Sequence, residues 1–146
     1  MNPNVSSRTR NQQAQTAETP LTSPTFGASA YSHRPVLNRQ ELTTRVGGDE
    51  AFVDELCALF RTSSRTLMSE LQAALKRADA QRIIADAHTL KGAALNIGAP
   101  TIARHVQWLE EAARERDWGL AAAAWKTLQD ELFRLEAEID QAGKAR

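Results

Sequence analysis

Apolar residues recur at the spacing of an α-helix in four successive stretches of this chain. In the last stretch the apolar positions are separated by 4, 3, 4, 3 and 4 residues, and polar residues fill the opposite side. These positions are Ala121, Trp125, Leu128, Leu132, Leu135 and Ile139. No stretch shows the alternation of apolar and polar residues that is typical of a half-buried strand. The sequence therefore predicts an all-α fold.

Residues that start and stop helices bound the other three stretches. They predict a long helix from Asp49 to about Arg77, a second from about Asp79 to Gly98, and a third that begins at Pro100. The expected buried positions are Phe52, Leu56, Leu59, Phe60, Leu67, Leu71 and Ala74, then Ile83, Ala87, Leu90, Ala94 and Ile97, then Ile102, Val106, Leu109 and Ala113. Short loops make consecutive helices antiparallel, which predicts an up-down-up-down four-helix bundle.

The N-terminal part of the chain differs in composition. Residues 1–34 are rich in Asn, Gln, Ser, Thr and Pro and poor in large apolar side chains, so we expect a disordered tail. Residues 35–146 are expected to form one domain. Within it, residues 35–46 predict a short helix that caps one end of the bundle, and Gly47 and Gly48 end it.

Charge and composition exclude several classes of protein. The formal net charge is zero, which gives no reason to expect binding to nucleic acid. No apolar run approaches the ~20 residues that span a bilayer, so we expect no membrane insertion, and the N-terminus does not resemble a signal peptide. The single cysteine, Cys57, fits a reducing compartment. We expect a monomeric cytoplasmic protein.

One exposed patch is predicted on the helix that carries the stripe Ile83–Ile97. At about 100° per residue, His88 projects about 140° from the centre of that stripe and should face solvent. Lys91 and Gly92 follow it by three and four residues and are its neighbours on the helix surface. Glycine inside a helix costs about 1 kcal/mol relative to alanine, so a bare backbone at this position suggests a function.

The segment His88-Thr89-Leu90-Lys91-Gly92, followed by Ala93, Ala94 and Gly98, closely resembles the signature of histidine-containing phosphotransfer (HPt) domains. The resemblance extends over about residues 35–139. Members of this family are helical bundles whose histidine carries a phosphoryl group between the aspartates of receiver domains.

The resemblance implies a role for each residue of the motif. His88 would be the phosphoacceptor, Lys91 would stabilise the charge of the phosphoryl group, and Gly92 would leave room for the group and for a docking domain. The partners would be receiver domains of response regulators or hybrid kinases. The receiver would bring the divalent metal, so we expect no cofactor, and the absence of a Gly-rich phosphate loop predicts no ATP binding and no autokinase activity. The alternative is a helical interaction module that binds a kinase, receiver or other enzyme without transferring phosphate.

A second stripe on the same helix consists of Ile84, His88, Lys91 and Leu95. Two interpretations remain open for its aliphatic members. Ile84 and Leu95 either pack against neighbouring helices, or form an apolar patch on which a receiver docks, with Arg82 and Lys91 at its rim.

The remaining titratable residues show no metal-ligand spacing. His33 lies in the tail and is interpreted as solvated. Cys57 is expected to be buried and inert, and His105 to be a structural or surface histidine. The carboxylates of Glu110, Glu111 and Glu131 are interpreted as a solvated helix face.

Overall fold

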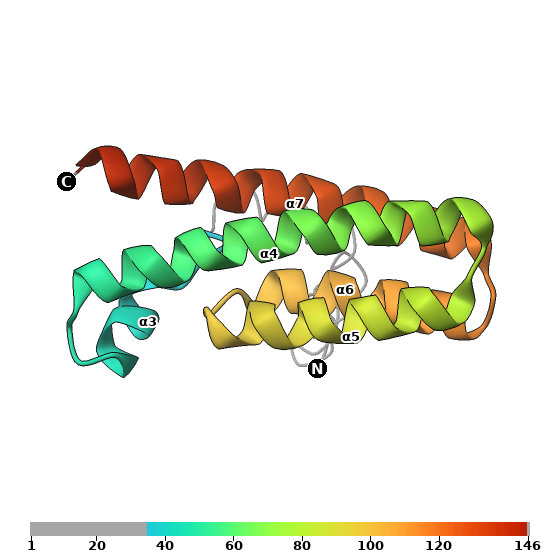
Figure 1. Ribbon diagram of the computed structural model, residues 1–146, viewed down its shortest axis with the longest axis horizontal. Coiled ribbons are helices and arrows are strands. Elements are labelled where there is room, and N and C mark those ends of the chain that lie inside the picture. Colours follow the sequence, from blue (N-terminus) through green and yellow to red (C-terminus); the bar gives the residue numbers. More distant parts are fainter. Residues whose placement is uncertain (1–34, 146) are drawn as a thin grey trace, which may run out of the picture. The chain divides into compact units, whose positions relative to one another are not determined.

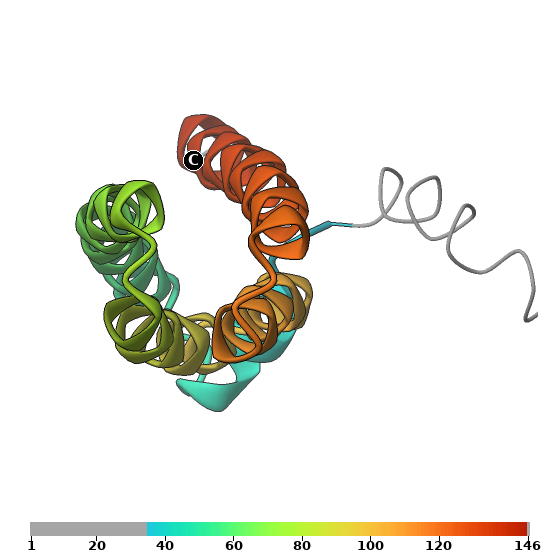
Figure 2. The same ribbon diagram turned by 90° about the vertical axis from the view of Figure 1, so that its right-hand side faces the viewer.

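The computed structural model describes residues 35–145, which form five helices and no strand. The helices are α3 (Arg39–Arg45), α4 (Glu50–Arg77), α5 (Ala80–Asn96), α6 (Pro100–Arg114) and α7 (Trp118–Ala145). The four long helices run alternately in opposite directions and follow one another in chain order around the core (Figures 1 and 2). The predicted all-α, up-down-up-down four-helix bundle is confirmed. The predicted disordered tail, residues 1–34, lies outside the described residues.

The four long helices begin and end close to the positions that the sequence predicts. The side chains of Asp49, Asp79 and Asp117 each accept a hydrogen bond from the backbone N–H three residues later, at 3.0 or 3.1 Å. Gly98 follows α5 with a φ of 81°, and Pro100 occupies the first turn of α6. In the described part of the chain, no helix combines the length and the apolar composition needed to cross a membrane.

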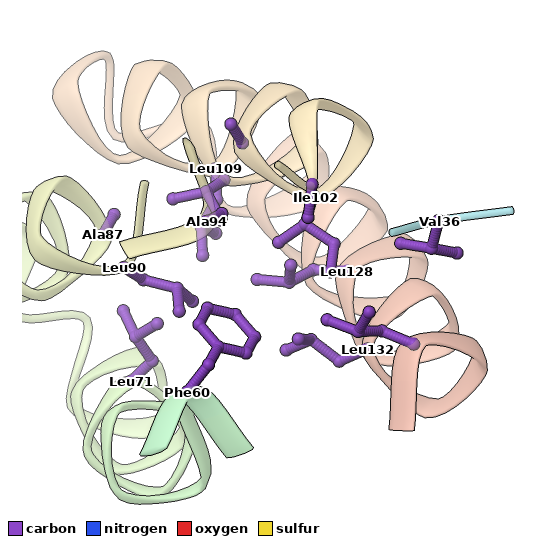
Figure 3. Close-up of a cluster of buried hydrophobic side chains, with 14 of the residues drawn as sticks. Val36, Phe60, Leu71, Ala87, Leu90, Ala94, Ile102, Leu109, Leu128 and Leu132 are labelled. Carbon is purple, nitrogen blue, oxygen red and sulfur yellow. The ribbon is translucent and has the colours of Figure 1, made fainter. Parts of the chain in front are cut away.

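The core is built from one face of each long helix. Figure 3 shows side chains of four helices pointing toward one another, with Phe60 of α4 facing Leu90 of α5 and Leu128 of α7. The predicted stripes of α5, α6 and α7 are confirmed. Buried members are Ile83, Ala87, Leu90, Ala94, Ile97, Ile102, Val106, Leu109, Ala113, Ala121, Leu128, Leu132 and Leu135; Trp125 and Ile139 are half-buried against them.

The predicted stripe of α4 is partly wrong. Phe52 and Leu59 are exposed at 43% and 64%, whereas Val53 and Cys57 beside them are fully buried. Phe60, Leu71 and Ala74 are buried as predicted, and Leu56 and Leu67 are half-buried against the core. The buried face of the first half of α4 is therefore rotated by about one residue, or about 100°, from the predicted one.

The partners of the first half of α4 explain this rotation. Its neighbours there are α3 and α7: Arg39 of α3 pairs with Asp54 at 2.7 Å, and Glu136 of α7 pairs with Arg65 at 3.0 Å. Helix α5 has 17 residues against the 28 of α4 and ends before it reaches the first turns of α4 (Figure 1). The face that carries Phe52 and Leu59 consequently has no helix over it.

The segment before α3 is fixed without being helical. The prediction of a helix over residues 35–46 is too long, because α3 begins at Arg39 with Asn38 as its N-cap. The backbone N–H groups of Val36 and Leu37 instead donate to the carboxylate of Glu138 in α7, at 2.7 and 3.0 Å. Both residues are buried although they lie outside the helix.

Helix α3 covers the end of the bundle at which α5 terminates, as predicted. The side chain of Arg45 donates to the carbonyl oxygen of Asn96 at 2.7 Å, and the N–H of Asn38 donates to the carbonyl of Gly98 at 2.9 Å. A cation at the C-terminus of a helix also stabilises the helix dipole.

Two buried polar side chains, His105 and Glu131, lie on α6 and α7. The ring of His105 is 2% exposed and meets the ring of Trp108 edge-on, with 5.1 Å between centroids. Burial, followed by the charge of Arg104, lowers its pKa. His105 is thus a structural histidine.

Glu131 is 6% exposed, so its interpretation as part of a solvated helix face is wrong. Burial raises the pKa of its carboxyl, although Arg134 acts in the opposite direction.

The depressed pKa of His105 predicts a pH-dependent stability. In the unfolded chain this imidazole takes up a proton near its ordinary pKa of about 6.5, whereas in the fold it stays neutral to lower pH. The free energy of unfolding should therefore fall as the pH is lowered through about 6.5 and level off below the folded-state pKa. The raised pKa of the Glu131 carboxyl has the opposite effect. Above its ordinary pKa of 4.5, it makes the free energy of unfolding rise as the pH is lowered.

The variant His105→Phe keeps the bulk of the ring and removes its titration. Urea unfolding at about pH 8 and about pH 5.5 should show a smaller loss of stability on acidification for this variant than for the natural chain. Equal losses in the two proteins would contradict the assignment to His105.

Candidate functional site

The candidate site lies on α5, whose orientation is fixed by its buried face. Ile83, Ala87, Leu90 and Ala94 have no exposed surface. His88 lies about 140° around the helix from that face and is exposed, as the sequence predicts. An imidazole here can meet a partner molecule directly.

Lys91 lies three residues after His88 and is held toward α6. Its side chain is 26% exposed, and its Nζ lies 3.9 Å from Oε1 of Glu110. Glu110 also pairs with Arg114 one turn further along α6. Lys91 thus forms part of a cluster of two cations and one carboxylate, and it is less exposed than an ordinary surface lysine.

The interpretation of Glu110 as part of a solvated helix face is wrong. Only 7% of Glu110 is exposed, whereas its neighbour Glu111 is exposed as expected. The phase of α6 accounts for the difference, because Glu110 lies beside the apolar stripe on the side that faces α5. A buried carboxylate requires a counter-ion, and Lys91 and Arg114 supply it. The helical position of Glu110 next to Leu109 was the signal in the sequence.

Gly92 leaves an open space beside His88. A Cβ atom built on Gly92 would meet no other atom within 4 Å, so the packing of this chain does not require a glycine there. Its helical backbone does not require one either, since φ is not positive. Neither packing nor backbone conformation therefore explains why this position carries a glycine that costs about 1 kcal/mol of helix stability. The space left by the missing side chain faces solvent.

The three candidate docking residues of α5 have different environments. Ile84 is half-buried and packs against the core, which favours the packing interpretation for this residue. Leu95 is 53% exposed. Arg82 pairs with Asp86 at 3.0 Å and with Glu70 of α4 at 3.3 Å. It thus lies on the α4 side of α5, away from Lys91, and does not form a rim with it.

Two apolar residues of α4 that the sequence predicts to be buried are exposed. Phe52 and Leu59 lie seven residues apart, and Glu70 lies another eleven residues on, so at about 100° per residue all three share one face. The pair formed by Glu70 and Arg82 shows that this face is turned toward α5. Leu95 follows Lys91 by four residues and lies on the α6 side of α5, so Leu59 and Leu95, both more than half exposed, are candidates for apolar contacts on either side of the exposed face of α5.

The other candidate residues are not brought to this site. Cys57 is fully buried on α4, as predicted. His105 lies on the side of α6 that faces α7 and not α5. His33 lies outside the described residues. Within residues 35–145 no group of His, Cys, Asp or Glu side chains could hold a metal ion.

Comparisons with known proteins agree with this geometry. The family model of the Hpt domain matches residues 55–145. A crystal structure of histidine-containing phosphotransfer protein B (HptB) from Pseudomonas aeruginosa is 28% identical, with a TM-score of 0.70 over 77% of this chain and 97% of that one. The histidine-containing phosphotransfer protein ZmHP2 from maize is 19% identical and shares the fold, with a TM-score of 0.66 over 84% of this chain and 98% of that one.

No curated protein sequence matches the chain. The family model nevertheless covers more than half of it, and the matched residues include α5 with His88, Lys91 and Gly92. The chain therefore belongs to the Hpt domain family, whose members carry phosphoryl groups in phosphorelays.

Proposed function

We propose that His88 is the residue of this phosphorelay intermediate that accepts the phosphoryl group from a receiver aspartate and passes it to another. The observation that supports the proposal is the exposure of His88 on α5, with Lys91 on one side and the open backbone of Gly92 on the other. A neutral imidazole carries a lone pair on one ring nitrogen and can act as a nucleophile.

The transfer needs few groups from this chain. The lone pair of Nε2 of His88 attacks the phosphorus of the aspartyl phosphate, and the N–P bond forms as the P–O bond to the aspartate breaks. The electron pair of that bond leaves with the carboxylate of the receiver. Positioning and charge stabilisation dominate such reactions, and Lys91 supplies a positive charge one helical turn from the imidazole.

The receiver would provide the aspartate and the divalent metal, so this chain would need no cofactor of its own. It would act as a carrier without ATP binding or autokinase activity, and as a monomer. The alternative, a module that binds without transferring phosphate, is distinguished by the labelling experiment below.

We predict that His88→Gln abolishes phosphorylation. Incubation with a phosphorylated receiver should give the natural chain an acid-labile, base-stable label, and the variant none. Because His88 is exposed, the melting temperature should be almost unchanged. Thr89→Ala, a neighbouring change on the exposed surface, serves as the control and should label normally. A fully labelled His88→Gln variant would show that another residue accepts the phosphoryl group.

Lys91 should affect transfer more than folding. Lys91→Ala removes the cation nearest to His88 and should slow phosphotransfer or shorten the lifetime of phosphohistidine. It also leaves Glu110 with Arg114 as its remaining partner, so we expect a loss of stability of about 1 kcal/mol or less. Lys91→Arg keeps the charge and should retain most of the rate. Equal stopped-flow transfer rates in the natural chain, Lys91→Ala and Lys91→Arg would contradict a role of Lys91 in transfer.

Gly92 offers a test in which stability and function move in opposite directions. Gly92→Gln should stabilise helix α5 by roughly 0.5–1 kcal/mol, because no neighbouring atom blocks a side chain at this position. The same side chain should obstruct the receiver and slow transfer. Gly92→Ala, with a single added carbon, should be stabilised similarly and slowed less. Faster or unchanged transfer in Gly92→Gln would exclude a steric role.

Receiver docking is the remaining part of the proposal. A receiver that reaches Nε2 of His88 must lie over the exposed face of α5, next to Gly92. Leu95 of α5, toward α6, and Leu59 on the neighbouring α4 are exposed on either side of that face, and apolar anchors of this kind concentrate the energy of transient interfaces. We assign the docking surface to Leu95 and Leu59, without Ile84 and Arg82, which are engaged within the bundle.

Single changes to serine test this assignment. Leu59→Ser and Leu95→Ser should each weaken receiver binding by about 1–2 kcal/mol and leave the melting temperature almost unchanged. The control is Phe133→Ser on α7, which removes an even more exposed apolar side chain, 77% exposed, from the helix across the core from α5. Titration calorimetry that finds the same loss for Phe133→Ser, or no loss for the two leucines, would rule out the surface.

A further inference from the structure

A groove of about 340 Å³ runs between α6 and α7. Its walls carry Trp108 of α6 and Leu120 of α7, which are 47% and 58% exposed, and Ala124 contributes to its floor. Small side chains line the groove between them, so both apolar side chains remain in contact with solvent. Apolar residues gathered in this way on a surface, rather than scattered singly, mark sites of interaction.

The groove lies on the opposite side of α6 from the phosphotransfer site. Glu110 faces α5, because it pairs with Lys91. Trp108 precedes it by two residues and therefore points about 200° away around the helix. A protein docked over His88 on α5 would leave the groove uncovered.

The charge of the groove is of one sign. Its charged lining residues are Glu111 and Glu115, both exposed, and no Lys or Arg lines it. Glu111 accepts a hydrogen bond from Gln107 at 3.0 Å, which leaves its negative charge uncompensated by that contact. Arg114, the adjacent cation on α6, pairs with Glu110 on the other side of the helix.

We propose that this groove binds an amphipathic helix of a partner protein that presents large apolar side chains flanked by Lys or Arg. The walls are two antiparallel helices, so a third helix can lie along them with its apolar face inward. Trp108 and Leu120 contact the apolar side chains of the partner, and Glu111 and Glu115 select basic residues at the edge of its apolar face. The groove lies on the side of α6 that faces away from α5 and His88, so such a partner and a receiver can bind to the chain at the same time.

The charge argues against a second copy of this chain as the occupant. A twofold interface brings the same patch of both copies together. It would place Glu111 and Glu115 of one copy beside those of the other, and like charges at an interface oppose association.

The binding experiment uses two fluorescently labelled synthetic amphipathic helices with the same Leu and Phe face. The basic probe carries Lys on its polar face and the acidic probe carries Glu. Anisotropy titrations with the full chain at low salt should show tighter binding of the basic probe by about tenfold or more. Leu120→Ser should weaken that binding about tenfold. The double variant Glu111→Lys, Glu115→Lys should reverse the preference between the probes.

One variant with a matched loss of exposed apolar surface serves as the control. Phe133→Ser on the far side of α7 should bind the basic probe as the natural chain does. Equal binding of both probes, an equal loss in Phe133→Ser, or an unchanged preference in the charge-reversed variant would overturn the proposal. Sedimentation that shows a dimer of the natural chain and a monomer of Leu120→Ser would also overturn it, because a second copy would then fill the groove.

Discussion

The burial of one face of α5 determines where His88 lies. Ile83, Ala87, Leu90 and Ala94 are removed from solvent completely, and burial of a side chain as large as Ile83 or Leu90 contributes roughly 1.5–3 kcal/mol. With that face fixed, the helical repeat leaves His88 no position except the outer surface. The imidazole thus needs no contacts of its own to be presented at the surface, and a change at His88 is separated from the stability of the bundle.

The difference in length between α4 and α5 leaves apolar side chains of α4 at the surface. Helix α4 continues for several turns beyond the end of α5, and there its buried face turns toward α3 and α7. Phe52 and Leu59 remain at the surface as a result. In a bundle of equal helices these side chains would be covered. The short α5 therefore leaves apolar surface exposed on the helix next to the one that carries His88.

The sequence predicted what local periodicity and capping control, and failed where a residue's environment depends on distant helices. Each of α5, α6 and α7 keeps one phase throughout, so its stripe and its caps could be predicted from spacing alone. The neighbours of α4 change along its length, and the pairings of Asp54 and Arg65 that reveal the change cannot be found in local sequence. Glu110 is a different case: its position beside Leu109 places it next to the buried stripe of α6, but its pairing with Lys91 of α5 cannot be found from local spacing. Exposure of His88 followed from periodicity, but the role of its neighbours required the resemblance to a family.

The charges near His88 suit the proposed phosphoacceptor role. A phosphoryl group brings a charge of about −1.5 to −2 near neutral pH, and an isolated carboxylate beside it would oppose the transfer. Glu110 is not isolated, because Lys91 and Arg114 both pair with it and leave the cluster with an excess of positive charge. The burial of Glu110 has a further consequence. Its carboxylate keeps Lys91 close to α6 and partly out of water, where the ammonium is screened less than on an open surface. Lys91 is thereby held one turn from the imidazole before any partner arrives, so in the proposed transfer less side-chain freedom would have to be lost.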